Sequence, residues 1–368
     1  MDRALALVVG GGPAGASCAW RLARGGADVT VVERSEFPRR KVCAGALGHR
    51  GASLLVSEGM ISAEELESHT LLAHRTMSCW FRYDRLRAHS PRGPSIRIVD
   101  RDAFDAMLVR RSQEAGARVL EGEAVAGLGP GEARTETGRR LGWDYLVVAD
   151  GAAGSVGRRF RRKRRRRSIG LGVQAFVPGG GNAKDGLQIH FGLLPWGYGW
   201  VFPRGADTAV GIGGTGGCFQ PRGLGARMPE LLRHSGGTGR EKLEGGAIPS
   251  GPPARRMGRG RIYLAGDAAG LADRISGEGI SHAIESGLLV ARAILRGGDR
   301  PWLLRQAGRG CLGLVRQSRI FAGLLYHPRL QPRAMRRLRE DEKFFQGYWD
   351  LVAGSTSYWR MMLRFLRA

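Results

Sequence analysis

The chain has 368 residues, 42% of them hydrophobic, which is enough for two domains or for one domain with insertions around a sizeable core. Its 58 basic and 33 acidic residues give a net charge of +25, which favours an anionic partner such as nucleic acid, anionic lipid or a phosphorylated substrate. The five scattered cysteines argue against a disulfide framework and lack zinc-ligand spacing, so we expect a reducing cytosol and no bound metal. No apolar run reaches transmembrane length, and Ala4 to Val9 is too short for a signal peptide.

The first thirty-odd residues follow the order strand, glycine turn, helix, strand, acid. The apolar run Ala4 to Val9 leads into Gly10-Gly11-Gly12-Pro13-Ala14-Gly15, and a helical stretch of small residues continues to Arg24. A second apolar run, Val29 to Val32, ends in Glu33. This order is typical of a dinucleotide-binding βαβ unit.

Each glycine of the turn has a separate reason to be there. Gly10 permits the tight turn, Gly12 lets a pyrophosphate approach the backbone, and Gly15 lets the helix pack closely on the strand. The helix N-terminus then offers free N–H groups and its positive dipole end to the phosphates. Glu33 lies where a carboxylate bonds a ribose hydroxyl, so the stretch predicts binding of an adenine dinucleotide, either FAD or NAD.

Periodicity and turn residues predict the remaining elements in chain order. In the first half we expect a loop entering a helix over Ser35 to Gly51, a short polar helix over Ala63 to Glu67, strands over Arg75 to Arg87 and Ser95 to Val99, a helix over Arg101 to Ala115 capped by Asp100, and strands over Ala117 to Leu120, Ala124 to Leu128, Glu132 to Leu141 and Tyr145 to Ala149. In the second half we expect strands over Leu171 to Val177, Leu187 to Phe191, Tyr198 to Phe202, Thr208 to Ile212 and Arg261 to Leu264, a helix within Gly223 to Ser235, a long helix over Glu278 to Leu295, and a basic, aromatic helical region from Pro301 onward.

This order predicts an α/β (α+β) fold with interleaved domains. A Rossmann-like dinucleotide-binding domain would comprise residues 1–74, 100–168 and 251–300. An antiparallel-sheet substrate domain would comprise 75–99 and 169–250, and a C-terminal helical region 301–368.

Two further carboxylates follow apolar strands beside glycines. Asp150-Gly151 and Gly266-Asp267 both suit a flavin site, because the acid can bond ribose or ribityl hydroxyls while the glycine lets the backbone approach the cofactor. Either pair alone would be read as an ordinary Asp-Gly turn. Together with the glycine turn at the start, they favour the flavin.

The order of these motifs resembles that of FAD-dependent enzymes of the p-hydroxybenzoate hydroxylase fold. The residues that carry this resemblance are Glu33, Arg101, Ala149-Asp150-Gly151 with Ser155, and Gly266-Asp267-Ala268-Ala269. Three further stretches resemble the geranylgeranyl reductase family: Lys41-Val42-Cys43-Ala44-Gly45, Gly197-Tyr198-Gly199-Trp200-Val201-Phe202-Pro203 and Gly277-Glu278-Gly279-Ile280. The resemblance covers nearly the whole chain. The chain departs from the family at Ala44, where a second glycine is usual, and at Asp273-Arg274, where many relatives have proline.

The resemblance implies a reductase that saturates isolated double bonds in prenyl chains, carried by isoprenoid lipids or prenyl diphosphates. Bound FAD would supply the hydride, and NAD(P)H or a reduced carrier protein acting as redox partner would supply the electrons. Cys43 would lie near the isoalloxazine as a proton donor or substrate-positioning group; otherwise it is a small buried hydrophobe. Tyr198 and Trp200 would line the substrate cavity; otherwise they are strand core.

The resemblance and the strand-end motifs together give one expected set of cofactor-binding residues. The set is Gly10, Gly12, Pro13, Ala14, Gly15, Glu33, Arg34, Cys43, Ala44, Gly45, Arg101, Ala124, Val125, Asp150, Gly151, Gly266, Asp267, Gly277, Gly279 and Ile280. The helix that begins near Ile280 would point its positive end at the flavin and stabilise negative charge on the reduced ring. We interpret Glu278 as a helix-start acid rather than a catalytic base.

Two stretches carry weaker signals. Gly211-Ile212-Gly213-Gly214-Thr215-Gly216 also matches the dinucleotide pattern, but no helix, second strand and acid follow it, so we interpret it as a strand end and loop. The basic run Arg158 to Arg167 favours contact with an anionic membrane or is a solvated loop; nucleic acid is disfavoured because no nucleic-acid-binding fold accompanies it. The C-terminal group of Tyr348-Trp349, Tyr358-Trp359 and Met361 to Leu366 either anchors in a membrane interface or is buried against the substrate domain. We therefore expect a cytoplasmic protein, peripheral on the inner membrane face.

Two other functions stay open from the sequence alone. One is a flavin-dependent monooxygenase or halogenase of the same fold, although a halogenase is expected to carry a Trp-x-Trp-x-Ile-Pro type motif and Gly197 to Pro203 is not one. The other is a basic binding protein whose flavin fold has lost catalysis. A purified protein that binds no flavin would favour that interpretation.

Overall fold

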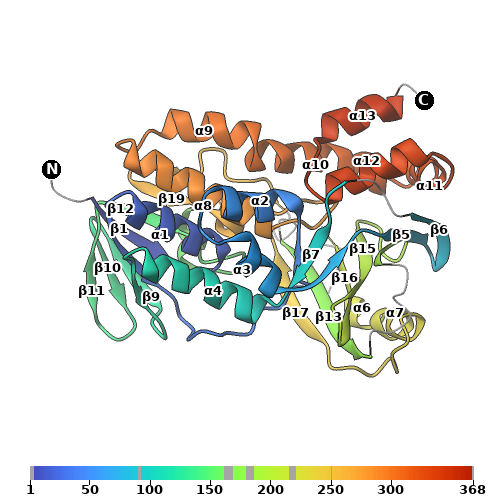
Figure 1. Ribbon diagram of the computed structural model, residues 1–368, viewed down its shortest axis with the longest axis horizontal. Coiled ribbons are helices and arrows are strands. Elements are labelled where there is room, and N and C mark those ends of the chain that lie inside the picture. The colour runs from blue at the N-terminus through green and yellow to red at the C-terminus, as the bar shows by residue number, and fades with distance from the viewer. Residues whose placement is uncertain are drawn as a thin grey trace.

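Two main sheets lie beside each other, and the helices of the last third of the chain run along both of them (Figure 1). The structure is a computed structural model that describes residues 4–89, 93–160, 169–179, 186–214, 221–249 and 251–366. Most of the basic run Arg158 to Arg167 lies outside these residues, as does the end of the glycine run after Gly214. The predicted α/β (α+β) class is confirmed.

The first sheet has the strand order β18-β19-β12-β1-β2-β8, and every strand except β18 runs parallel to its neighbours. Its strands are β1 (Leu5–Val9), β2 (Asp28–Val32), β8 (Arg118–Leu120), β12 (Tyr145–Val148), β18 (Gly258–Arg259) and β19 (Ile262–Leu264). Apolar side chains fill these strands almost without interruption because both faces of the sheet are covered. The carboxyl ends of the parallel strands meet at one edge, which brings together the turns that follow β1, β2, β12 and β19.

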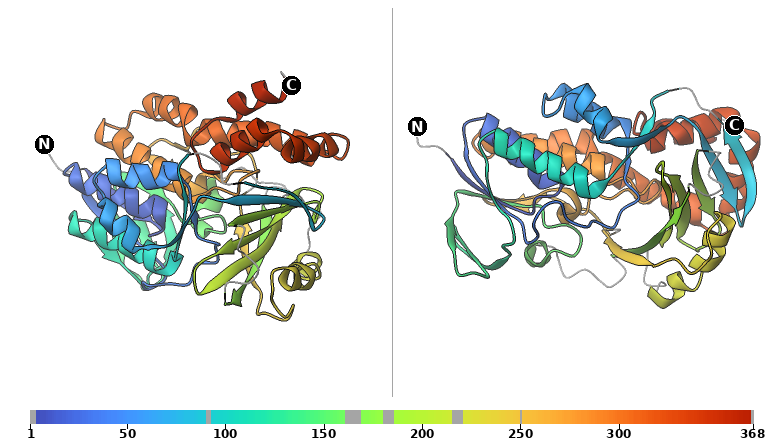
Figure 2. Two further views of the ribbon diagram at one scale, coloured as in Figure 1. Left: turned by 45° about the vertical axis from the view of Figure 1, so that its right-hand side comes forward. Right: turned by 60° about the horizontal axis from the view of Figure 1, so that its bottom comes forward.

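Helices cover one face of this sheet, and a small sheet covers the other (Figure 2). On the helical face, α1 (Pro13–Arg24) packs against α8 (Ile280–Leu295) and α4 (Arg101–Glu114). The small sheet consists of β9 (Val125–Gly129), β10 (Glu132–Thr135) and β11 (Arg140–Gly142), in the order β11-β10-β9. The single strand expected over Glu132 to Leu141 is therefore two strands, which turn at Gly138 with a φ of 86°.

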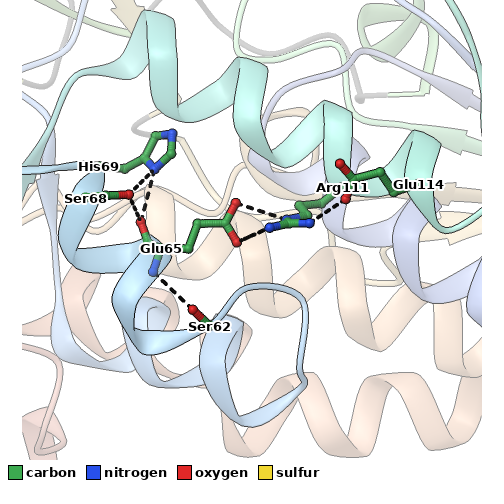
Figure 3. A network of polar contacts seen from close by, with 6 residues as sticks. All are labelled: Ser62, Glu65, Ser68, His69, Arg111 and Glu114. Atoms are coloured by element: carbon green, nitrogen blue, oxygen red, sulfur yellow. Dashed lines mark hydrogen bonds and ion pairs between the residues drawn. The ribbon is translucent and has the colours of Figure 1, made fainter.

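An outer layer of α2 (His49–Ser57) and α3 (Ala63–Ser68) shares a core with α4, and a polar network pins α3 to α4 (Figure 3). The Arg111 guanidinium donates to both carboxylate oxygens of Glu65 and also to Glu114. Ser62 caps α3 by accepting the Glu65 N–H at 3.1 Å. On α4, Asp100 accepts the Asp102 N–H at 2.9 Å, as predicted for a helix cap.

The second sheet has seven strands in the order β17-β13-β16-β15-β14-β5-β6 and is antiparallel except between β14 and β5. Its strands are β5 (Met77–Phe81), β6 (Asp84–His89), β13 (Gly170–Pro178), β14 (Leu187–Phe191), β15 (Gly197–Pro203), β16 (Asp207–Gly214) and β17 (Glu244–Ile248). On one face Val201 and Ile212 pack under α6 (Pro221–Gly225) and α7 (Met228–His234). On the opposite face Tyr198, Trp200 and Phe202 point toward the C-terminal helices.

The segment of residues 75–99, which was expected to belong entirely to the second sheet, is divided between two sheets. The strand expected over Ser95 to Val99 is β7 (Ile96–Val99), and it pairs with β3 (Ala46–Leu47) and β4 (Thr70–His74) in a separate sheet instead of joining the large one. The stretch Arg75 to Arg87 is a hairpin, because Arg82 and Tyr83 turn the chain with φ values of 49° and 70°. Strand β17 was not predicted, because the two glycines in Glu244–Ile248 leave no alternation of apolar and polar side chains.

The region from Pro301 onward is helical within the described residues, as predicted. Its helices are α9 (Arg300–Arg309), α10 (Cys311–Tyr326), α11 (Gln331–Glu340), α12 (Glu342–Val352) and α13 (Tyr358–Leu366). Of the C-terminal aromatic residues, Tyr348, Trp349 and Tyr358 are buried against the second sheet, whereas Trp359 is 46% exposed. No helix within the described ranges is long and apolar enough to cross a membrane.

Candidate functional site

The glycine turn after β1 has no room for side chains at two of its positions. Gly10 has a φ of 102°, and a Cβ there would lie 2.5 Å from the Ala149 carbonyl oxygen. A Cβ on Gly15 would lie 1.8 Å from the carbonyl oxygen of Gly10. The tight turn and the close helix–strand packing predicted for these two glycines are therefore both present.

Glu33 is fixed beside the same turn. Its Oε2 accepts the Gly11 N–H at 2.8 Å and its Oε1 accepts the Ser35 N–H at 3.2 Å, while the residue is only 7% exposed. Arg34, in contrast, is exposed. Ala124 and Val125 lie next to Glu33, because the preceding residue, Glu123, donates its N–H to the Glu33 carbonyl at 3.0 Å. The donors and acceptor of this corner fit the adenosine half of a dinucleotide.

Arg39 lies at the candidate site and was not among the residues expected from the sequence. One of its guanidinium nitrogens lies 3.5 Å from the point where a Gly12 Cβ would be, and 3.2 Å from Asp105 Oδ2. The guanidinium also stacks over the Phe37 ring, 4.9 Å from its centroid. A cation therefore stands beside the open backbone of Gly12, which fits a pyrophosphate. The signal in the sequence was the basic triplet of residues 39–41 directly after Pro38.

Arg101 and Cys43 meet at the start of α4. The Arg101 guanidinium donates to both oxygens of the fully buried Asp105 at 2.8 Å, and it also hydrogen-bonds the Cys43 sulfur. Burial opposes the charge on Arg101, but Asp105 and Cys43 outweigh it and raise the pKa of Arg101. The Gly45 N–H adds a second donor to the Cys43 sulfur at 3.4 Å. The sulfur is thus held by a cation and an amide.

The turn after β19 closes the site from the other side. A Cβ on Gly266 would lie 2.9 Å from that of Ala14, so the 3₁₀ helix Gly266–Ala269 lies directly against the start of α1. The Gly266 N–H is bonded to Ser286 on α8 at 2.9 Å. Asp267 lies near the start of α8, where a Gly279 Cβ would be 3.8 Å from its Oδ1. Residues predicted from both ends of the chain therefore meet at one point.

Asp150 has a local role that its sequence context did not reveal. Its Oδ2 accepts the Gly157 N–H at 2.9 Å at the start of α5 (Ser155–Phe160). Gly154 leaves space for this carboxylate, since a Cβ there would lie 1.9 Å from the Asp150 Cγ. Gly151 turns the chain with a φ of 79°.

The aromatic face of the second sheet reaches the loop that precedes α8. The Tyr198 hydroxyl lies 2.2 Å from the point where a Gly277 Cβ would be, and Gly277 has a φ of 70°. Burial, followed by the carboxylates of Asp273 and Glu278 and by Cys43, raises the pKa of Tyr198. The predicted substrate residue Tyr198 and the predicted cofactor residues Cys43 and Gly277 therefore share one site.

Trp200 explains the glycine run that mimics a dinucleotide motif. Its ring covers β16 and β13, where Cβ atoms on Gly211, Gly213 and Gly172 would lie 2.2, 3.2 and 3.5 Å from ring atoms. Because these three glycines have no side chains, the indole ring of Trp200 can lie flat over the two neighbouring strands. The strand end expected at the start of this run is confirmed, because β16 continues to Gly214, and the residues expected to form the loop lie outside those that the structure describes.

The loop before α8 is organised by Asp273. Its Oδ1 accepts N–H groups from Ile275 at 2.8 Å and Ser276 at 2.9 Å, and the Tyr358 hydroxyl at 2.6 Å. Glu278 Oε1 accepts the Ser281 N–H at 2.8 Å in the first turn of α8, which is the geometry of a helix-start acid. Burial raises the pKa of Glu278.

Two kinds of comparison identify the class of the chain. A family model described as "FAD binding domain" matches residues 3–171. Among solved structures, a geranylgeranyl bacteriochlorophyll reductase-like protein from Thermoplasma acidophilum has a TM-score of 0.80 at 20% identity, covering 92% of this chain and 93% of that one. A flavin-dependent brominase has a TM-score of 0.73 at 16% identity, covering 97% and 94%. The fold and the site thus define an FAD-dependent oxidoreductase of the p-hydroxybenzoate hydroxylase fold.

Curated relatives give the family. The menaquinone reductase of Mycobacterium tuberculosis is 30% identical over 361 residues, covering 90% of this chain and 86% of that protein. Digeranylgeranylglycerophospholipid reductase 1 of Methanopyrus kandleri is 30% identical over 315 residues, covering 76% and 77%. The chain belongs to the geranylgeranyl reductase family.

Proposed function

We propose that the protein saturates carbon–carbon double bonds in a geranylgeranyl or related isoprenoid chain, on a prenylated lipid or a prenyl diphosphate. The observation that carries this proposal is the contact between Tyr198, on the aromatic face of the second sheet, and Gly277, in the loop before α8. An apolar aromatic wall directly beside a flavin-binding loop suits a long hydrocarbon chain. The two curated relatives, a menaquinone reductase and a digeranylgeranylglycerophospholipid reductase, also support it.

The residues at the first sheet edge would hold FAD. Gly10, Gly12 and Gly15 with the N-terminus of α1 would receive the pyrophosphate, Glu33 the ribose, and Gly277 to Ile280 the flavin end. Reduced FAD supplies a hydride when bound. Cys43, held by Arg101 and the Gly45 N–H, would donate a proton or position the substrate. NAD(P)H or a reduced carrier protein would supply the electrons.

We also propose that the protein works at an anionic membrane surface on the cytoplasmic side. Ile320, Trp359 and Leu363 are 57%, 46% and 49% exposed, and they lie on α10 and α13, which Phe321 and Trp359 join through an edge-on ring contact at 5.9 Å. We call these three residues the α10–α13 patch. Tyr358, on the same helix as two of them, reaches the candidate site. A net charge of +25 favours anionic lipid.

The test of the reaction uses the purified, FAD-loaded protein, reduced without oxygen. Geranylgeranyl diphosphate, a geranylgeranylated glycerolipid and a geranylgeranylated naphthoquinone are each added, and the products are weighed by mass spectrometry. Gain of hydrogen pairs in the chain supports the proposal and identifies the preferred head group. A flavin-dependent monooxygenase or halogenase is the second candidate, favoured by the brominase likeness. Unchanged chains, together with rapid oxidation of the reduced flavin and of an added aromatic compound by oxygen, would support that candidate instead.

The membrane contact is tested by flotation with vesicles. The wild type should float with vesicles that contain phosphatidylglycerol and stay behind with purely zwitterionic ones. Replacing Trp359 and Leu363 by Ser should reduce flotation while FAD binding is retained. Equal flotation of both proteins would show that the α10–α13 patch is not the contact surface.

A further inference from the structure

Two buried tyrosines in the C-terminal helices have hydroxyl groups without a hydrogen-bond partner among the described residues. Tyr326, at the end of α10, and Tyr348, on α12, are each 2% exposed. Other buried tyrosines are satisfied: Tyr358 donates to Asp273 at 2.6 Å, and Tyr263 donates to the Gly298 carbonyl at 3.0 Å. A buried hydroxyl that lacks a partner destabilises the protein, so such groups in a folded chain call for an explanation.

Both hydroxyls belong to the neighbourhood of the candidate substrate wall. Tyr326 and Tyr348 share one core with Trp196, Tyr198 and Trp200. The Tyr326 ring lies 6.4 Å from that of Trp196, just before β15. Burial, followed by Tyr198 and Asp273, raises the pKa of Tyr326, and burial, Cys79, Tyr326, Tyr198 and Asp273 raise that of Tyr348. The two phenols therefore lie within electrostatic range of each other and of the tyrosine that contacts Gly277.

The chemistry around the two phenols selects the kind of group they can bind. A phenol hydroxyl donates one hydrogen bond and accepts others, so each of the two can donate to a carbonyl oxygen. The Asp273 carboxylate lies within electrostatic range of both phenols and contributes to the rise in their pKa values. A carboxylate repels a diphosphate but tolerates a neutral carbonyl.

We propose that Tyr326 and Tyr348 form a subsite for a neutral carbonyl oxygen on the head group of the substrate, as in a prenylated quinone. The proposal rests on the proposed function, because it takes the space beside Tyr198 as the substrate site. It deepens that function by assigning the head group: the C-terminal helices recognise an oxygen-bearing ring, and the aromatic sheet face receives the chain.

The experiment measures binding as well as folding, with the FAD-loaded protein and three Tyr→Phe variants. Tyr326→Phe and Tyr348→Phe remove the two hydroxyls, and Tyr263→Phe is the matched control, because its hydroxyl bonds a carbonyl outside the substrate region. Dissociation constants are measured for a geranylgeranylated naphthoquinone and for the same hydrocarbon chain without a head group. Melting temperatures are measured without either ligand.

The proposal expects each of the two site variants to bind the quinone about five-fold more weakly, while binding of the bare chain is unchanged. It also expects their melting temperatures without ligand to be equal to or above that of the wild type, since no protein hydrogen bond is lost. Equal losses for both ligands, or none, would overturn the proposal. A fall in melting temperature with unchanged quinone affinity would show that the hydroxyls hold water, and would overturn it as well.

The subsite and the proposed function can fail separately. If the wild type reduces geranylgeranyl diphosphate and the variants bind the quinone normally, only the subsite is wrong. If the wild type binds neither prenyl ligand, the substrate site itself is wrong and the subsite falls with it.

Discussion

The carboxylate of Asp273 accepts the Tyr358 hydroxyl at 2.6 Å, which ties the last helix of the chain to the loop before α8. The same Oδ1 also accepts the N–H groups of Ile275 and Ser276, and these bonds give the loop a defined shape. Both partners are buried, at 5% and 2% exposure. The C-terminal helices therefore support the loop before α8 and also cover the second sheet.

Removing this hydroxyl should destabilise the protein. We expect Tyr358→Phe to lower the free energy of unfolding by about 1.5–3 kcal/mol, because it deletes a buried hydrogen bond to a charged acceptor. Urea unfolding of the apoprotein measures the change. Tyr348→Phe is the matched control, since its hydroxyl has no protein partner within the described residues. Equal stability of the two variants would mean that the Asp273 bond does not hold the loop.

Gly15 should tolerate no side chain. A Cβ there would lie 1.8 Å from the Gly10 carbonyl oxygen, so Gly15→Ala must push α1 away from β1. We expect a loss of about 1–3 kcal/mol in the free energy of unfolding, with loss of bound FAD measured by absorbance. Gly308→Ala on α9, which meets nothing within 4 Å, is the control and should be neutral or stabilising. Retention of FAD by Gly15→Ala would contradict the close packing inferred for the turn.

The sequence predicted those parts of the site that depend on local pattern. The glycine turn, Glu33 and the strand ends could be placed because parallel strands bring their carboxyl ends to one edge, whatever the length of chain between them. Arg39 and Asp105 could not, because their pairing depends on how α4 lies across the turn. The Gly211 run looked like a second motif only because the indole ring of Trp200, which needs the space, comes from a neighbouring strand.

In the C-terminal region, too, the sequence predicts the helices but not the contacts between distant side chains. Its helices follow from their composition, but nothing local to Tyr326 or Tyr348 shows that their hydroxyls lack a partner. Asp150 shows the reverse case, in which a plausible strand-end motif also has a local use as the cap of α5. The hydrogen-bond partners of these side chains depend on how distant elements pack together, so they cannot be predicted from the spacing of residues along the chain.

The pair Arg101–Asp105 should be essential for folding. Asp105 is fully buried and makes two hydrogen bonds of 2.8 Å to Arg101, so Asp105→Asn leaves a buried guanidinium without its counter-charge. We expect a loss of about 3–5 kcal/mol, measured by urea unfolding. The control is Glu132→Gln, which breaks the exposed pair with Arg140 and should leave stability unchanged within error. If both variants unfold at the same urea concentration, the buried pair contributes little.

His190 predicts a pH dependence of stability. Burial, followed by the nearby His234, lowers the pKa of His190 from 6.5 to about 3. Between pH 6.5 and about pH 3, His190 is therefore protonated in the unfolded chain and neutral in the folded chain. Because the unfolded state binds the additional proton, the free energy of unfolding falls as the pH falls through this window. His190→Gln should remove up to about 1.4 kcal/mol per pH unit from the slope of unfolding free energy against pH. Parallel curves for wild type and variant would exclude a role for His190.

Cys43 offers a test between two roles in the proposed reaction. If its sulfur donates the proton, Cys43→Ala should lower kcat for chain reduction by about 100-fold or more and leave KM unchanged. If it positions the substrate, KM should rise and kcat should change less. Cys79→Ala, at a buried cysteine on β5, is the control for the loss of a thiol from a different core than that of Cys43. FAD absorbance confirms that each variant is loaded, and wild-type kinetics in Cys43→Ala would leave the sulfur with neither role.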